Sequence, residues 1–302
     1  MAKTETTTKL LARFGRLNSQ RANWENHWQE VADYMMPRKA NITKKRSRGD
    51  KRNELIFDSS PLQALELLAA SLHGMMTNPS TPWFTLKFKD AQMDQNDEAK
   101  LWLESVTADM YTAFNRSNFQ QEIFELYHDL ITFGTAAMYI EEDDEDLLKF
   151  STKHIAEIFI AEDDKGRIDT VYRKFTLSAR ALVQKFGNKV SQNIKVMSEK
   201  DPYQDVDILH CVYPRADFNP KLKDQENMPF ESVYLEMGSG DELSVSGFKE
   251  FPYVVPRYLK ASHEIYGRSP AMTALPDVKM LNEMSKTTIK AAQKQVDPPL
   301  LV

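Results

Sequence analysis

Apolar residues repeat with helical spacing through the first part of the chain. Within residues 18–36, Trp24, Trp28, Val31 and Met35 fall at i, i+4, i+7 and i+11, so they share one helical face. The same spacing predicts helices around residues 61–75, 103–114 and 119–133, and alternation of apolar and polar residues predicts a short strand over residues 83–88. We expect four aromatic residues of these patterns in the core: Trp24, Trp28, Trp83 and Phe84.

Strand patterns replace helical ones after residue 136. Strands are predicted at residues 137–140, 155–160, 168–175, 205–213 and 231–237, with a hairpin around Asp163-Asp164-Lys165-Gly166 and a short helix at residues 176–186. Residues 247–257 are expected to be extended, because Pro252 and Pro256 disfavour helical conformation in the residues before them. The chain is therefore predicted to have an α+β fold.

The last part of the chain has the pattern of one long helix. Ser269 is a good N-cap, and Pro270 then occupies the first helical position, where a missing N–H costs nothing. Pro276 removes one hydrogen bond of the helix, so we expect a bend or a short leading turn there and the main helix over residues 276–296. Asp297-Pro298-Pro299 ends it, which gives a rod of roughly 32 Å.

The second half of this helix is too polar to be buried in a monomer core. It consists mainly of Lys, Thr, Ala and Gln, with few large apolar residues besides Ile289. Such a helix bridges domains, lines a channel or packs against copies of itself. A basic stripe recurs every four residues at Lys286, Lys290 and Lys294. The stripe faces DNA, pairs with carboxylates of a neighbouring copy, or is solvated, and the sequence leaves all three open.

A second basic cluster lies between residues 38 and 52, where eight basic residues accompany one acidic residue, Asp50. The segment is predicted to be a mobile loop. Its candidate phosphate contacts are Lys44, Lys45, Arg46, Arg48, Lys51 and Arg52. The alternatives are a localisation signal and a solvated arm, of which the solvated arm is favoured.

Composition limits the classes of function. With 302 residues the chain can bury a sizeable core and is expected to contain two or more substructures. The formal net charge of −5 indicates that the molecule as a whole does not hold duplex DNA tightly, so any DNA contact is local and weak. No apolar run approaches the roughly 18 residues of a membrane span, and residues 1–10 lack the apolar core of a secretory signal, which predicts a cytosolic protein.

No segment predicts a catalytic residue, a metal site or a cofactor. The acidic run at residues 141–146 lacks the ligand spacing and the glycine of a calcium loop, so a solvated turn is favoured. His210 and Cys211 are neighbours on a predicted strand and therefore face opposite ways. Cys211 is the one cysteine, which excludes an internal disulfide. The phosphate-binding pattern GxxxxGKS/T and the dinucleotide pattern GxGxxG are both absent, so an ATP-driven activity is not expected.

Four segments form a recognisable set. They are Trp24-Glu25 with Tyr34 and Pro37; Phe57-Asp58-Ser59-Ser60 with Leu68-Ala69-Ala70-Ser71-Leu72, Thr77-Asn78-Pro79 and Trp83-Phe84; Phe251-Pro252-Tyr253-Val254-Val255-Pro256-Arg257; and Tyr266-Gly267-Arg268-Ser269-Pro270 through Leu275-Pro276-Asp277 to Asp297-Pro298-Pro299. In these segments the chain resembles the portal proteins, or head-to-tail connectors, of short-tailed bacteriophages. The resemblance covers essentially the whole chain, and its last two segments are specific.

The resemblance implies a portal-type fold with an outer wing and a long stem helix beside a central tunnel. Its parts are a helical wing region at residues 1–136, a β-rich wing region at 137–265, the stem helix at 266–297 and the start of the clip at 298–302. Portal chains continue through the clip, a second stem helix and further wing and crown regions. We therefore expect this sequence to be part of a longer protein.

The function implied by the resemblance is mechanical rather than enzymatic. A ring of identical subunits, twelve in such a family, sits at one capsid vertex of the virion and passes double-stranded DNA during packaging and ejection. The implied partners are further copies of the chain, the major capsid and scaffolding proteins, the terminase large subunit that supplies the energy, a tail adaptor protein and the DNA. Assembly takes place in the cytoplasm of the bacterial host.

Two rival classes remain. A tail adaptor or other virion structural protein without a DNA tunnel would not need a capped helix with a lysine stripe. A metal-dependent nuclease would need a carboxylate cluster with a suitably spaced basic partner, which the acidic run lacks.

Overall fold

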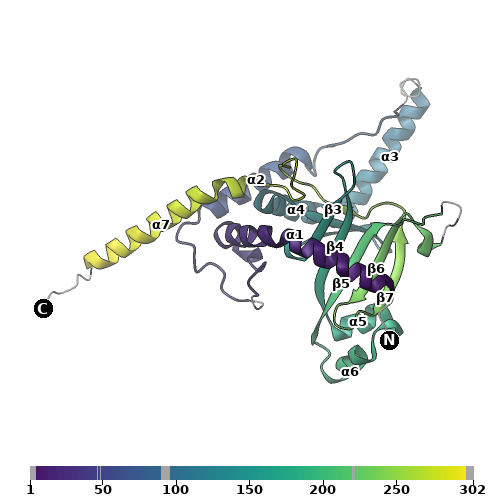
Figure 1. The fold of residues 1–302 in the computed structure, drawn as a ribbon. Helices are drawn as coiled ribbons and strands as arrows, with labels where there is room; N and C mark the ends of the chain where they lie inside the picture. Colours follow the sequence, from purple (N-terminus) through teal and green to yellow (C-terminus); the bar gives the residue numbers. More distant parts are fainter. Residues whose placement is uncertain are drawn as a thin grey trace. The chain divides into compact units, whose positions relative to one another are not determined.

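The fold is described from a computed structural model that defines residues 5–45, 47, 49–89, 96–219, 222 and 224–296. Within these ranges the helices are α1 (Glu5–Met35), α2 (Ser60–Met76), α3 (Asp97–Arg116), α4 (Phe119–Phe133), α5 (Ala179–Phe186), α6 (Gln192–Lys200) and α7 (Pro270–Val296) (Figure 1). The strands are β1 (Ala137–Asp143), β2 (Leu147–Lys153), β3 (Ile158–Glu162), β4 (Ile168–Ser178), β5 (Asp205–Pro214), β6 (Phe230–Glu236), β7 (Glu242–Phe248) and β8 (Tyr253–Val254). The predicted α+β class is confirmed.

The chain folds into two compact units, each assembled from two separate segments. Unit 1 comprises Met1–Glu25 and Ala156–Tyr253, and unit 2 comprises Asn26–Ile155 and Val254–Val302. The predicted wing and stem regions are contiguous ranges of the chain, whereas each of these units combines two ranges. The division into wing and stem stays a prediction. The predicted start of the clip, residues 298–302, lies outside the described residues.

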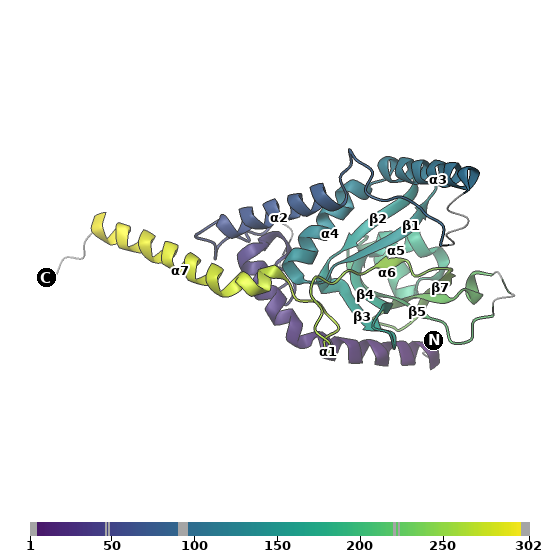
Figure 2. The same cartoon turned by 90° about the horizontal axis from the view of Figure 1, so that it is seen from above.

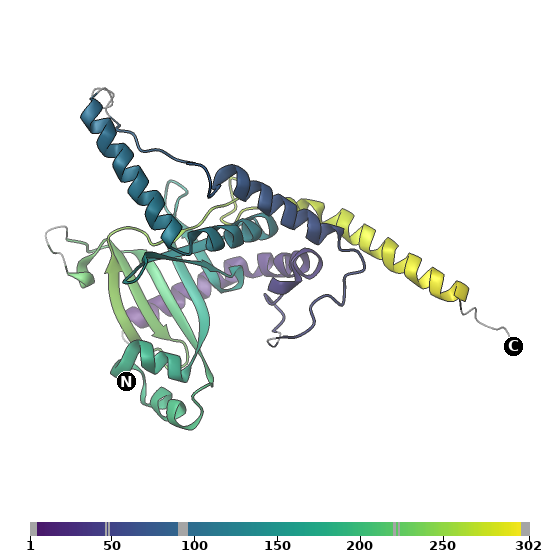
Figure 3. The ribbon, with the colours of Figure 1, turned by 180° about the vertical axis from the view of Figure 1, so that it is seen from behind.

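Unit 1 is built around a five-stranded sheet in the order β3-β4-β5-β6-β7, in which each neighbouring pair is antiparallel. The first half of α1 lies along one face of this sheet (Figure 3). Its Leu10 joins a core with Tyr172 and Leu209. On the other face, α5 and α6 bury their apolar side chains against Ile208 and its neighbours. Ile208 and Leu209 are adjacent on β5 and enter different cores, because successive side chains of a strand point to opposite faces.

Unit 2 is organised around α4, nine of whose 15 residues are buried. Helix α2, strand β2 and the start of α7 contact it, and β2, β1 and β8 form a three-stranded sheet in that order. Gly134 ends α4 in the left-handed conformation with φ of +77°, which glycine adopts without steric cost. Seen from above in Figure 2, α7 extends outward from the rest of unit 2.

Sequence patterns located the long elements and missed several short ones. The structure adds α6, β2 and β7, and α1 begins well before the predicted start of its helix. The predicted hairpin around residues 163–166 is present as β3 and β4. Helix α7 is continuous through Pro276, so the leading turn belongs to the same helix.

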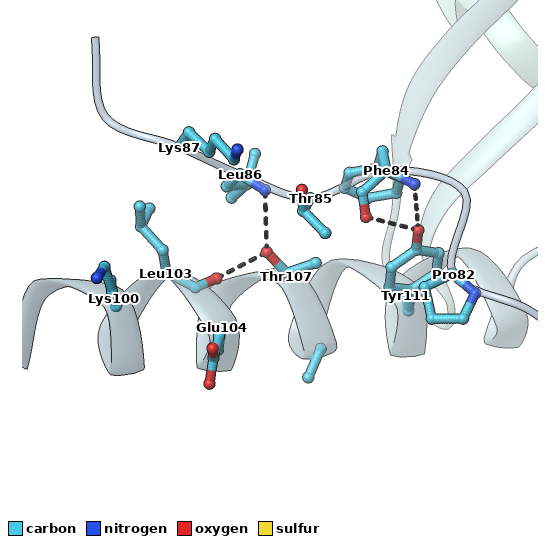
Figure 4. A pocket seen from close by; sticks show the side chains of 11 residues that line it. Pro82, Phe84, Thr85, Leu86, Lys87, Lys100, Leu103, Glu104, Thr107 and Tyr111 are labelled. Carbon is cyan, nitrogen blue, oxygen red and sulfur yellow. Dashed lines mark hydrogen bonds between the residues drawn. The ribbon is translucent and has the colours of Figure 1, made fainter. Parts of the chain in front are cut away.

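Residues 83–88 form no β-strand, which corrects the prediction for this segment. The hydroxyl group of Tyr111 on α3 accepts hydrogen bonds from the amides of Trp83 (2.7 Å) and Phe84 (2.6 Å) and donates one to the carbonyl of Phe84 (2.8 Å). The hydroxyl group of Thr107 accepts from the amide of Leu86 at 3.4 Å, at the pocket between the segment and α3 (Figure 4). Side chains of a helix thus satisfy this extended backbone in place of a partner strand.

The four aromatic residues predicted to be in the core differ in burial. Trp28 is fully buried, as predicted. Trp24 and Phe84 are only half-buried, and Trp83 is 36% exposed, so the prediction is wrong for Trp83. Trp83 stacks parallel to Phe119 at a centroid distance of 6.0 Å and leaves its outer side to solvent.

Candidate functional site: the long C-terminal helix and its anchor

The long helix α7 is anchored in unit 2 by the residues just before it. Tyr266 is buried and packs edge-to-face on Trp28 at a centroid distance of 5.1 Å. The indole N–H of Trp28 donates to the carbonyl of Phe133 at 3.1 Å, which satisfies its polar atom inside the core. The end of α4 and the start of α7 are thereby held by the same two aromatic rings.

Two glycines allow the backbones to meet at this anchor. A Cβ atom on Gly267 would lie 2.3 Å from the carbonyl oxygen of Gly134, and a Cβ atom on Gly134 would lie 2.3 Å from that of Gly267. The amide of Gly267 donates to the hydroxyl of Thr135 at 2.8 Å. Because no side chain fits between these segments, glycine is needed at both positions.

Ser269 caps α7, as the sequence predicts. Its hydroxyl accepts from the amide of Met272 at 3.0 Å and donates to the carbonyl of Thr132 at 2.8 Å. The first turns then bury Ala271 and Leu275 in unit 2. One serine therefore both starts the helix and ties it to α4.

Asn282 is the last buried residue of α7 and binds the segment before α2. Its side-chain oxygen accepts from the amides of Phe57 (2.7 Å) and Asp58 (3.3 Å), and its side-chain nitrogen donates to the carbonyl of Leu55 (2.9 Å). Sequence reasoning did not single out Asn282. A signal existed, because this polar residue lies at helical spacing from the apolar residues Ala271, Leu275 and Val278.

Of the three lysines in the stripe, one forms an ion pair and two form none with any described residue. The ammonium group of Lys286 bonds both carboxylate oxygens of Glu283 at 3.0 Å and lies 5.7 Å from the ring centre of Phe57. Lys290 and Lys294 are exposed and form no ion pair with any residue of the described ranges. Every residue of α7 after Lys286 is exposed, so the rest of unit 2 does not cover the end of the helix.

The basic segment at residues 38–52 is held in place at its beginning, which corrects the prediction of a mobile loop there. The side-chain oxygen of Gln29 accepts from the amides of Ile42 and Thr43 at 2.9 Å, and Lys44 pairs with Asp33 at 2.8 Å. The guanidinium group of Arg52 donates to the carbonyl of Arg38. Lys45 and Lys51 are exposed, and Arg46 and Arg48 lie outside the described residues. Lys44 and Arg52 are thus engaged within the chain, and a shared phosphate site of the six residues stays a prediction.

A charge cluster follows α1, where Lys39 contacts two carboxylates of α4. Its ammonium group lies 2.5 Å from Asp129 and 2.6 Å from Glu125, and Arg38 also pairs with Glu125 at 3.0 Å. Burial raises the pKa of Asp129 to about 6, against the opposing effect of Lys39. Burial acts in the same direction on Glu125, but the hydrogen bonds and charges of Lys39 and Arg38 leave the pKa of that carboxyl below its usual value. Burial lowers the pKa of the neighbouring His128.

Replacement of Asp129 by Asn should alter the pH dependence of stability in a defined direction. The folded protein keeps the Asp129 proton up to about pH 6, whereas the unfolded chain loses it at about pH 4. Within this window the folded state binds the additional proton, so the contribution of Asp129 to the free energy of unfolding falls as pH rises. The free energy of unfolding of D129N minus that of the wild type should therefore increase between about pH 4 and 6. Glu125→Gln is the control, since the lowered pKa of Glu125 predicts the opposite slope, at pH values below its unfolded pKa of about 4.3. A flat difference for D129N would contradict the assignment.

The other residues considered for catalysis or metal binding are His210, Cys211 and the acidic run at residues 141–146. His210 stacks on Tyr234 at 3.9 Å and its Nε2 atom lies 3.0 Å from the hydroxyl of Ser232. Cys211 is buried, and burial raises the pKa of its thiol. The first three residues of the acidic run belong to strand β1, and only residues 144–146 form the turn to β2, so the predicted turn is shorter than expected. In the described part of the chain, no group of three or more His, Cys, Asp or Glu side chains is placed to hold a metal ion, and no helix is long and apolar enough to cross a membrane.

The candidate site is therefore one long, capped helix, which its first turns anchor in unit 2 and which is exposed after Lys286. Residues 7–302 match the family described as bacteriophage head to tail connecting protein, and the chain belongs to that family. The resemblance read from the sequence is thereby confirmed.

Two curated relatives carry the name portal protein. A probable portal protein of Bordetella phage BPP-1 is 34% identical over 296 residues, which cover 96% of this chain and 53% of that protein. A portal protein of Salmonella phage epsilon15 is 34% identical over an alignment of 307 residues, which covers 100% of this chain and 55% of that protein. The chain therefore spans about half the length of these relatives.

Proposed function

We propose that the protein to which this chain belongs is a portal: a ring of identical subunits at one vertex of the capsid, through which double-stranded DNA enters and leaves and to which the tail is joined. The observation that carries the proposal is α7, a helix of 27 residues that is exposed at every position after Lys286. A helix of this kind is stable when copies of the chain or a channel surround it. Membership of the connector family supports the same conclusion.

The proposed channel holds DNA weakly. Lys290 and Lys294, which have no ion-pair partner among the described residues, would be repeated around a ring as circles of positive charge. Each phosphate that such a charge neutralises adds salt-dependent affinity, so a few contacts per subunit guide the duplex, whereas many would stop it from sliding. The net charge of −5 keeps the rest of the chain from gripping the DNA.

The proposed role is mechanical, without a catalytic residue or a cofactor of its own. The motor is a terminase large subunit, and the other partners are the capsid and scaffolding proteins, the tail adaptor and further copies of the chain. The protein assembles in the cytoplasm of the bacterial host and ends in the virion. These partners are proposed from the family to which the chain belongs.

The oligomeric state of the full-length protein tests this proposal. We expect native mass spectrometry to give a closed ring, twelve subunits being the expected number. Heterologous contacts that close under rotation produce a ring with a fixed number of subunits rather than open oligomers of increasing length. A stable monomer or dimer under assembly conditions would contradict the portal function.

A further inference from the structure

The outward side of α2 carries no charged residue over its whole length. Residues that share this side at helical spacing are Ser60, Gln63, Ala64, Leu67, Ala70, Ser71, Gly74 and Met75. Leu67 is 70% exposed and Met75 is 74% exposed. The titratable residues of the helix are elsewhere on it, where Glu66 pairs with His128 and His73 contacts Tyr127. A helix exposed to water normally carries its charges on the outward side, so an uncharged outward side indicates a contact surface.

An apolar groove continues this side of α2 towards α7. It has a volume of about 170 Å³, with Leu65 and Leu68 of α2 on one side and Ala271, Ala274 and Val278 of α7 on the other. No charged residue lines it. Its occupant is therefore an uncharged surface that projects far enough to fill a groove between two helices.

The outer half of α7 has such a surface. Its charged residues after Val278 share one side of the helix: Lys279, Glu283, Lys286, Lys290 and Lys294. Leu281, Met284, Thr288 and Ala292 lie on the opposite side at i, i+3, i+7 and i+11, and Met284 is 60% exposed. The helix thus has one charged and one uncharged side along the same length.

A chain cannot bring these two surfaces together by itself. The groove is formed by the first turns of α7, and the uncharged side belongs to later turns of the same continuous helix. A rigid helix does not fold back onto its own beginning, so the α7 that fills the groove comes from another molecule.

We infer that the α2 side and its groove, which we call the α2 surface, bind the uncharged side of α7 from a second copy of this chain. The inference rests on the proposed ring and specifies its contact. The two surfaces are different patches of one chain, so the contact is heterologous and propagates from copy to copy until the ring closes. It also leaves the lysine side of α7 uncovered by the neighbour.

Two glutamate substitutions in the full-length protein test the contact, because each places a charge in an uncharged interface. Leu67→Glu on the α2 surface and Met284→Glu on α7 should each raise the protein concentration needed for ring assembly at least tenfold, as measured by analytical ultracentrifugation. The matched control is Leu101→Glu, since Leu101 is a leucine of similar exposure, 65%, on the separate helix α3. All three side chains are exposed, so melting temperatures should stay at the wild-type value.

The outcomes separate this inference from the proposed function. Rings of the wild type and of L101E, with loss of assembly in L67E and M284E, support the contact. If the wild type forms rings and either L67E or M284E assembles normally, or if L101E fails as they do, the contact is wrong and the portal function stands. If the wild type itself remains monomeric, both are overturned.

Discussion

Trp28→Ala is expected to lower the free energy of unfolding by about 3–5 kcal/mol, because it removes a fully buried indole and leaves a cavity. The lost side chain packs on Tyr266 and bonds the carbonyl of Phe133. The alanine variant therefore also leaves a buried carbonyl without its donor. Denaturant or thermal unfolding of the full-length protein measures the change.

The matched control is Trp102→Ala. Trp102 lies on α3 and is 59% exposed, so its removal creates no enclosed cavity and should change stability by less than about 1 kcal/mol. Equal losses for the two variants, or normal stability of W28A, would show that Trp28 does not anchor the start of α7. A drop confined to W28A supports the anchor that the structure describes.

The long helix was predictable because its signals are local. A serine cap, a proline at the first helical position and lysines at intervals of four residues can each be read within a few residues. The anchor was not predictable in this way. Gly134 and Gly267 are 133 positions apart in the sequence, and only the folded chain shows that their backbones exclude a Cβ atom between them.

Other differences have physical causes of the same kind. Residues 83–88 alternate as a strand does, yet their backbone partners are the hydroxyl groups of Tyr111 and Thr107 on a helix. Asn282 and Gln29 bind backbone amides of other segments, and the sequence does not show which segment each side chain binds. Patterns therefore predicted the long elements, while long-range polar contacts decided where the basic loop and the long helix are fixed.

Replacement of Lys286, Lys290 and Lys294 together by Gln is expected to leave ring assembly intact and to change DNA packaging or genome retention in a salt-dependent manner. Phosphate contacts weaken as the salt concentration rises. Binding releases counterions from the DNA, and their release is less favourable when the solution already contains more of them. The difference between the wild type and the triple variant should therefore be largest at low salt and shrink as salt increases. Packaging assays at several salt concentrations measure it.

The structure separates the three lysines and so supplies the internal control. Lys286 already bonds Glu283, whereas Lys290 and Lys294 have no ion-pair partner among the described residues. K290Q/K294Q should reproduce most of the effect of the triple variant, and K286Q alone should have little, because its charge is partly compensated. If the triple variant fails to assemble, the stripe is an interface between copies. If it assembles and packages normally at every salt concentration, the stripe is a solvated side of the helix and the DNA passes without contacting it.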